Sequence, residues 1–275
     1  MSAKEIIVKP ISSQDAARIV KSCHYSGKVV QNSQLHFGVF LNGKCGGAMQ
    51  FGPSLDKRKI QGLVSGTGWN SFIELNRMAF ADWLPRNSES RAIAVAMRLI
   101  RKSYPHIEWV VSFADGTQCG DGTIYRASGF ILTGIKENNQ IWEAPGGEKF
   151  SRMSLTDGRS KQQQQQARVV ASRTTPTKGK HMENGASSMR QFSNAGWKPL
   201  KGFQLRYIYF LNPAAQERLT VPILPFTEIQ RRGAGMYLGK PKRAGSDTSD
   251  TPAFQAGEGG SLPTPALHSQ PSPNP

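Results

Sequence analysis

The stretch from residue 72 to residue 100, FIELNRMAFADWLPRNSESRAIAVAMRLI, joins a strand pattern to a helix pattern. Residues 72–80 predict a strand, although the polar residues at 74–77 are hard to bury without a purpose. Residues 85–89 supply helix-capping residues and an acidic first turn, and apolar residues then recur at i, i+3, i+4 and i+7. The stretch therefore predicts a strand that leads into the clearest helix of the chain.

The segments on both sides of this pair predict more strands and two shorter helices. Residues 5–9 indicate a first strand, and a helix follows that begins after Ser12 and ends at 23–27. Asn42 and Gly43 favour a hairpin turn, because both residues tolerate the positive φ that such turns need. Further strands are expected at 35–41, 44–51, 108–114, 130–135 and 206–211. Residues 140–144 are expected to pair with 130–135, and a short helix is expected around Tyr125. This order predicts a mixed α/β domain with one central sheet and flanking helices.

The charge of the chain is concentrated in one segment. The 275 residues include 35 Lys and Arg against 19 Asp and Glu, a formal net charge of +16. Residues 158–201 hold nine of the basic residues, one acidic residue and few apolar ones, which predicts a disordered basic insertion that attracts nucleic acid. A solvated insertion without a partner is the alternative. Residues 241–275 predict a disordered tail, so the catalytic domain is expected over 1–157 and its final strand and extension over 202–240.

Composition excludes several classes of protein. No apolar run approaches the roughly 18 residues of a membrane-spanning helix, and the N-terminus lacks the pattern of a signal peptide. Cys23, Cys45 and Cys119 have neither the spacing of a disulfide framework nor the CxxC pairs of a structural zinc site. We expect a cytoplasmic protein without a membrane partner.

Short motifs carry a resemblance to a known family. They are CHYSG at 23–27, LNRM at 75–78, PRNSESR at 85–91, SFAD at 112–115 and IY at 124–125. In their order and spacing, over about residues 1–156 and again over 202–240, the chain resembles the phage Mom proteins, which have a GNAT-like acyltransferase fold. The resemblance implies a transferase that converts adenine in double-stranded DNA to N6-carbamoylmethyladenine in the host cytoplasm. That modification shields phage DNA from host restriction enzymes.

The resemblance also implies the polar residues of the active site, which are His24, Tyr25, Ser112, Asp115 and Tyr125. His24 titrates near neutral pH, and Asp115 follows a strand end, where α/β sheets bind ligands. We expect either residue to assist deprotonation of the adenine amine, with Tyr125 as the acid and Tyr25 as a stacking surface or proton donor. The ordinary structural alternatives are a helix-ending histidine, a turn aspartate, a core hydroxyl for Ser112 and packing aromatics for the tyrosines.

The donor is expected where the strand at 72–80 meets the next helix, because a helix N-terminus binds anions. The GNAT resemblance implies an acyl-type donor, with acetyl-CoA as a candidate. However, the loop at 86–91 lacks the glycines of the usual pyrophosphate loop, and Glu89 would oppose a phosphate. The expected donor contacts are Arg77, Arg86, Asn87, Ser88 and Arg91.

A metal ion is not expected. Iron held by His24, His36 and Asp115 is an alternative that no ligand spacing supports. Cys119 is a candidate thiol nucleophile, although a bystander cysteine is the commoner case.

Short basic clusters are the expected DNA contacts. They are Lys57, Arg58 and Lys59, then Arg168 and Arg173 of the insertion, and finally Arg231 with Arg232. For each short cluster a solvated loop is the alternative. Trp69 or Phe72 is a candidate stacking surface for an extruded base, against the alternative of a core position.

Two other functions fit the sequence. One is a GNAT acyltransferase that acts on a protein, a small amine or another modified DNA base. The other is a non-catalytic DNA-binding phage protein, in which charge reversal in 158–201 would abolish binding while active-site substitutions change nothing. A homodimer is compatible with all of these functions.

Overall fold

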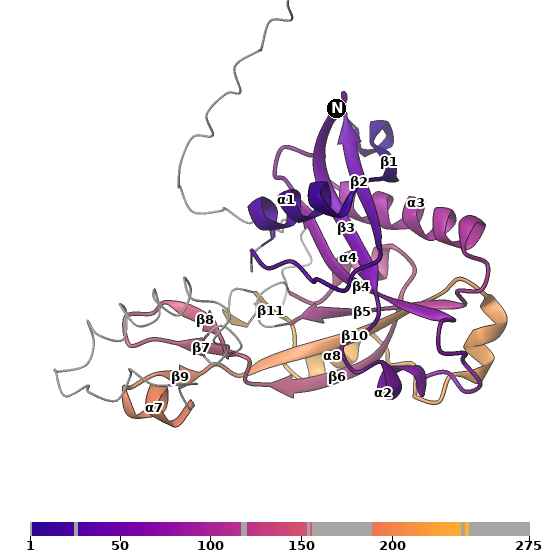
Figure 1. Cartoon of the computed structure of the whole chain (residues 1–275). Helices are drawn as coiled ribbons and strands as arrows, with labels where there is room; N and C mark the ends of the chain where they lie inside the picture. The colour runs from indigo at the N-terminus through magenta and orange to yellow at the C-terminus, as the bar shows by residue number, and fades with distance from the viewer. Residues whose placement is uncertain are drawn as a thin grey trace, which may run out of the picture.

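A seven-stranded sheet forms the centre of the computed structural model, which describes residues 2–24, 27–116, 120–152, 155, 189–237 and 240–241 (Figure 1). In spatial order its strands are β1 (Ile7–Pro10), β2 (Leu35–Leu41), β3 (Lys44–Gly52), β4 (Phe72–Phe80), β5 (Trp109–Asp115), β10 (Gly202–Phe210) and β6 (Ile131–Asn138). The β4–β5 pair is parallel, and the other neighbouring pairs are antiparallel. The predicted mixed α/β fold with one central sheet is confirmed.

The last strand of the main sheet enters between two earlier ones. β10 pairs with β5 from Gln204↔Asp115 to Phe210↔Trp109, and on its other side it pairs with β6. The strand predicted at 206–211 therefore joins the interior of the sheet and not its edge. Its side chains are correspondingly buried, with Leu205, Tyr207 and Ile208 at 0% exposure.

Helices cover both faces of the sheet. One face packs against α3 (Ser88–Ser103), α4 (Thr123–Ala127) and α8 (Thr227–Arg231), in a core that includes Ile93, Met97 and Ile229. The other face carries α1 (Ser13–Cys23), and beyond it α2 (Lys57–Gln61) and the 3-10 helix η2 (Pro213–Arg218). A further 3-10 helix, η1 (Ala3–Glu5), contacts α3. Among the described residues, no helix is both long and apolar enough to cross a membrane.

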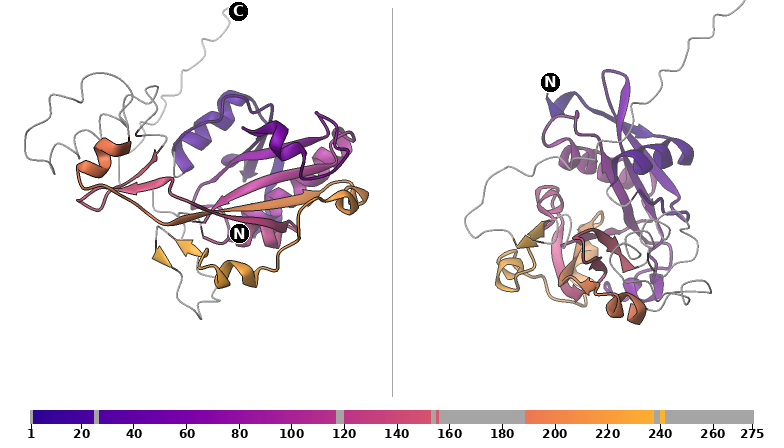
Figure 2. Two further views of the ribbon diagram at one scale, coloured as in Figure 1. Left: turned by 90° about the horizontal axis from the view of Figure 1, so that it is seen from below. Right: turned by 90° about the vertical axis from the view of Figure 1, so that its left-hand side faces the viewer.

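A second, smaller sheet projects to one side of the main sheet (Figure 2). It consists of β8 (Lys149–Ser151), β7 (Ile141–Glu143) and β9 (Lys198–Pro199), and α7 (Met189–Asn194) lies next to it. Trp142, Phe192 and Trp197 form its own core, each at most 6% exposed. A separate two-stranded pair joins β11 (Met236–Tyr237) to β12 (Lys240–Pro241).

The small sheet corrects two expectations. The segment at 140–144 does not pair with 130–135, because β10 occupies that side of β6 and the side chain of Trp142 belongs to the small core. The basic insertion is not low-complexity chain throughout, since residues 189–201 contain α7, β9 and buried aromatic side chains. Residues 158–188, and the tail predicted at 241–275 apart from Pro241, lie outside the described residues.

A stack of aromatic rings holds α4 against β10. The Tyr207 ring lies 5.2 Å from that of Tyr125 and 6.5 Å from that of Phe226, and the Tyr207 hydroxyl donates to the carbonyl of Asp121. Gly122 adopts a φ of +72°, and a Cβ there would lie 2.6 Å from Cε2 of Tyr207. Both its backbone conformation and the ring beside it therefore require a glycine.

Gly122→Ala is expected to destabilise the fold by about 2–4 kcal/mol, because left-handed strain adds to a clash with a ring at full burial. Gly129→Ala is the matched control, since Gly129 has a φ of +84° but its Cβ would meet Tyr209 only at 3.5 Å. Urea unfolding of both variants measures the difference. Equal losses in the two variants would show that the Tyr207 contact contributes nothing.

Candidate functional site

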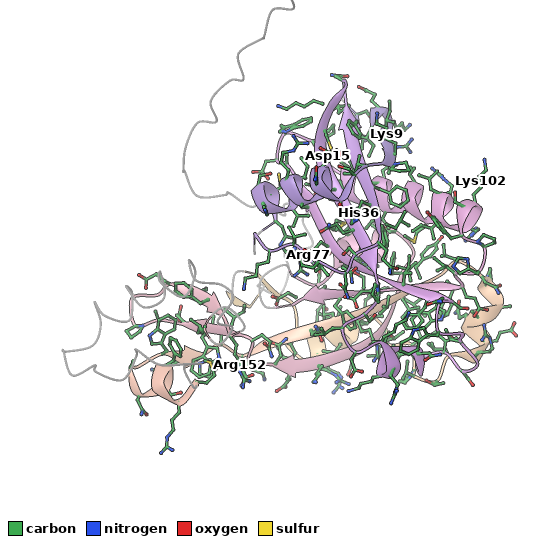
Figure 3. The ribbon with its side chains drawn as sticks, in the orientation of Figure 1. Lys9, Asp15, His36, Arg77, Lys102 and Arg152 are labelled. Atoms are coloured by element: carbon green, nitrogen blue, oxygen red, sulfur yellow. The ribbon has the colours of Figure 1, made fainter. Side chains whose placement is uncertain are left out.

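A row of polar side chains crosses three strands on the sheet face that carries α1. His36 of β2 is opposite Gln50 of β3, and Gln50 is opposite Arg77 of β4. Directly opposed residues share a face, and their neighbours Phe37, Met49 and other apolar side chains point to α3 instead. Figure 3 shows His36 and Arg77 on the sheet beside α1. We call His36, Gln50 and Arg77 the polar row.

Two β-bulges place these residues in line. The β2–β3 register shifts between Val39 and Phe40, and the β3–β4 register shifts between Gln50 and Phe51. In β4 the extra residue is Asn76, because Leu75 is opposite Phe51 while Arg77 is opposite Gln50. A bulge reverses the face on which later side chains point, and such irregularities often occur beside functional sites.

Gln50 is buried, and only one end of its side-chain amide has a hydrogen-bond partner among the described residues. It is 1% exposed, and Nε2 of its amide lies 3.4 Å from Nδ1 of His36. Among the described residues, its Oε1 has no hydrogen-bond partner. Turning the amide by 180° would exchange the two ends, so one end faces His36 and the other lacks a partner in either orientation. A buried amide of this kind carries a free-energy cost unless a ligand completes it.

Glu74 and Asn76 extend the polar row toward β5. Burial raises the pKa of the Glu74 carboxyl, although the Ser54 and Asn76 side chains and the charge of Arg77 act in the opposite direction. Asn76 accepts a hydrogen bond from the Ser33 hydroxyl at 3.0 Å and donates to the carbonyl of Pro53 at 3.4 Å. A buried carboxyl with a raised pKa is a typical proton acceptor in catalysis.

Glu74 also stands where two parallel strands separate. β4 and β5 pair at Phe72↔Trp109, Ile73↔Val110 and Glu74↔Val111. Both strands lie wholly within the described ranges and continue, to Phe80 and Asp115, without further pairing to each other. The facing edges of two such strands leave backbone groups available to a ligand.

His24 ends α1 on the same face of the sheet. Its backbone N–H donates to the carbonyl of Val20 at 3.0 Å, and burial, followed by the charge of Arg77, lowers its pKa to about 4. The imidazole is therefore neutral at neutral pH, and it is a weaker base than an ordinary histidine. Arg77 donates to the carbonyls of Lys28 at 3.0 Å and Asn76 at 2.8 Å, which ties the segment after α1 to β4.

The four expected catalytic residues that the structure describes fall on two faces. His24 lies on the α1 face, and Asp115 alternates with the α3-facing Ala114 and so points to the α1 face as well. Ser112 is fully buried on the α3 face, where its hydroxyl donates to the carbonyl of Leu75 at 3.4 Å. Tyr125 is stacked against Tyr207 in the core of that face. Tyr25 lies outside the described residues.

The residues expected to contact the donor do not all lie at one place in the structure. Ser88 is fully buried and its hydroxyl donates to the carbonyl of Pro85 at 2.5 Å, so its side chain does not face a donor. Arg77 is committed to carbonyls on the α1 face, and Arg91 donates to the carbonyl of Lys4 at 3.4 Å. Arg86 and Asn87 are exposed at the start of α3. Asn87 has a φ of 68° and forms no side-chain hydrogen bond to the first turn, which leaves that turn without a side-chain cap.

His24, His36 and Asp115 do not form a metal site. Over the described part of the chain, no group of three or more His, Cys, Asp or Glu side chains is arranged to hold a metal ion. Cys119 lies outside that part.

The expected DNA contacts have different surroundings. Arg58 and Lys59 are exposed on α2, and Nζ of Lys57 lies 4.6 Å from the centre of the Trp69 ring. Phe72 is a core residue, stacked on Trp109 with ring centres 4.5 Å apart, whereas Trp69 is 52% exposed.

Arg231 and Arg232 both pair with Glu228 at 2.6 Å, which lowers the pKa of Glu228 to about 2. The two arginines therefore contribute less free positive charge than their sequence suggests. Arg168 and Arg173 lie outside the described residues.

Comparison with known proteins identifies the family. Residues 5–228 match the family model described as the Mom protein family. The chain belongs to this family. The methylcarbamoylase mom of Escherichia phage Mu is 44% identical over 137 residues, which are 50% of this chain and 56% of that protein. This member of the Mom family thus matches its curated relative over about half of the relative's length.

Solved structures give weaker likenesses. A probable acetyltransferase from Staphylococcus epidermidis is 10% identical with a TM-score of 0.39, covering 74% of this chain and 98% of that one. A Bacillus subtilis acetyltransferase in complex with CoA is 7% identical with a TM-score of 0.37, covering 75% and 97%. TM-scores this low carry no argument about the fold. The fold is therefore assigned from the strand order, in which β10 lies between β5 and β6 next to the parallel β4–β5 pair.

The sequence of this Mom protein signals the β4 residues of the polar face but not those of β3. Glu74, Asn76 and Arg77 were conspicuous as polar residues within a strand, and in the structure Asn76 is buried while Glu74 and Arg77 are half-buried. Gln50 gave no such signal, because a glutamine near the end of a predicted hairpin strand is ordinary.

The pKa of His24 predicts a pH dependence of stability. The folded protein holds this imidazole neutral down to about pH 4, whereas the unfolded chain protonates it near its ordinary pKa of 6.5. The free energy of unfolding should therefore fall as the pH drops from 6.5 to 4, by up to roughly 3 kcal/mol from this residue. Chemical denaturation of the wild type and His24→Gln checks it. A pH slope that is the same in both proteins would contradict it.

Proposed function

We propose that this protein transfers a group to N6 of adenine in phage DNA, gives N6-carbamoylmethyladenine and so protects that DNA from host restriction. The observation that carries the proposal is the Mom family match over residues 5–228, which includes the whole polar row. The name methylcarbamoylase of the phage Mu relative supports the kind of group. Host cytoplasm is the proposed place of action, because that is where phage DNA is exposed to restriction enzymes.

Acid–base chemistry on the α1 face fits this reaction. The amine of adenine is a weak nucleophile, since its lone pair is shared with the ring, and it must lose a proton as the new N–C bond forms. We assign the proton acceptor to Glu74, whose burial raises its pKa toward the working range. His24, neutral at this pH, and Asp115 are the further candidates on that face.

Hydrogen bonding in the polar row would orient the reacting groups. The end of the Gln50 amide that has no partner among the described residues suits an amide or a purine edge, because each offers both a donor and an acceptor. Tyr25 and Tyr125 stay candidates for stacking and proton donation. Ser112 is better explained as a core hydroxyl that bonds to the backbone of β4.

The start of α3 is the proposed anchor of an acyl-type donor, such as acetyl-CoA. When bound, an acyl-CoA would supply the two carbons of the group and release its thiol. The carbamoylmethyl product joins N6 through its methylene carbon and carries an amide nitrogen, so a nitrogen-containing co-reactant is required besides the thioester. The exposed Arg86 and a first turn without a side-chain cap fit the phosphates of such a donor, whereas Glu89 in that turn opposes them. Double-stranded DNA is the proposed substrate, and a homodimer is a compatible assembly.

Glu74→Gln should lower the yield of modified deoxyadenosine by about 10²-fold or more, because the amide cannot accept the proton. Mass spectrometry of digested DNA from expressing cells measures the yield. The matched control is Glu217→Gln, an exposed glutamate of η2 that should leave the yield unchanged.

Unmodified nucleosides from cells that contain abundant, folded wild-type protein would overturn the proposed activity. Full modification by Glu74→Gln would overturn only the role of Glu74. Thermal unfolding of each variant controls for loss of the fold.

A further inference from the structure

We propose that the turn between β3 and α2 is a DNA wedge, in which Leu55 enters the base stack and takes the place of the extruded adenine. The inference rests on the proposed function, because the N6 atom is paired inside a duplex and must leave it for chemistry. Architectural and modifying proteins often insert an apolar side chain between base pairs for this purpose.

Leu55 is the most exposed large apolar side chain in the described part of the chain, at 95%. Single exposed leucines are common and need no explanation by themselves. Here, however, the two preceding residues are fixed to the candidate site. Pro53 accepts a hydrogen bond from Asn76, and Ser54 is 4% exposed with its side chain against Glu74. The exposed leucine therefore directly follows two residues that lie against the proposed site.

Positive charge follows the leucine at once. Asp56 caps α2 by accepting a hydrogen bond from the backbone of Lys59, so Lys57, Arg58 and Lys59 form the first turn of a capped helix. Within the described ranges, no acidic side chain forms an ion pair with Arg58 or Lys59. Three cations within one helical turn suit the phosphates on both sides of a widened base step.

Trp69 adds an aromatic surface to this cluster. It is 52% exposed, and Lys57 holds it by a cation–π contact at 4.6 Å while also donating to Asn70 at 3.2 Å. An indole ring fixed in this way can stack on a base or sugar beside the wedge. The cations that follow Leu55 on α2 disfavour a basic or purely apolar protein partner and favour a polyanion with stacked bases, which duplex DNA is.

The test measures base extrusion and modification separately. A set of duplexes carries 2-aminopurine in place of adenine, one position at a time, and its fluorescence rises when the base leaves the stack. Wild-type protein should raise the fluorescence at one or more positions, and Leu55→Ala should reduce that rise at least about tenfold. Leu55→Phe should restore most of it, because a phenyl ring also fills the gap. Ile223→Ala is the control, since Ile223 is another exposed large apolar side chain, at 49%, from a different segment of the chain.

Modification of single-stranded DNA distinguishes the wedge from the activity itself. Leu55→Ala should lose modification of duplex DNA but keep that of a single strand of the same sequence, which needs no extrusion. Equal extrusion by wild type and Leu55→Ala, or no extrusion by wild type, overturns the wedge. Extrusion that depends on Leu55 without any modified nucleoside supports the wedge and overturns the proposed activity. Equal loss on both substrates shows that Leu55 acts in chemistry and also overturns the wedge.

Discussion

The structure depends on a strand that is supplied late in the chain. β10 pairs with β5 on one side and β6 on the other, so neither of those strands completes its hydrogen bonding until residues 202–210 are in place. Tyr207 then stacks on Tyr125 and fixes α4, while Ile208 closes the opposite core. Without β10, the end of β5 that carries Asp115 would have no pairing partner on either side, because β4 has already turned away.

The separation of β4 from β5 and the two bulges act together. A parallel pair that continued to Asp115 would cover the backbone edge beside Glu74. Without the bulges, the alternation of side chains would send Gln50 or its neighbours into the apolar core under α3. The fold thus places a raised-pKa carboxyl, a neutral imidazole and an incompletely bonded amide on one face. Buried polar groups are costly, and this concentration of them is the feature that best separates a site from ordinary packing.

Local signals in the sequence predicted local structure well. The periodicity of α3, the Asn42–Gly43 turn with φ of 50° and 77°, and the late strand β10 are all present. The predicted pairing of 140–144 with 130–135 was wrong, because a three-residue strand contains too little sequence information to specify its partner. The pairing of Gln50 with His36 could not be predicted from the sequence, because a two-residue turn alone would place His36 opposite Met49. The extra residue in β3, Gly46, shifts the register so that Gln50 lies opposite His36. Position 46 requires a glycine because a Cβ there would lie 2.3 Å from the Trp83 ring.

The insertion leaves and re-enters the sheet at neighbouring points. Asn138, at the end of β6, is opposite Gly202, at the start of β10, so residues 139–201 begin and end about 5 Å apart. A segment closed in this way can change in length or composition over evolution at little cost to the sheet, because loop-closure entropy grows only slowly with length. The small sheet is therefore the part of this architecture that natural selection can exchange most freely, while the α1 face with its polar row stays as it is.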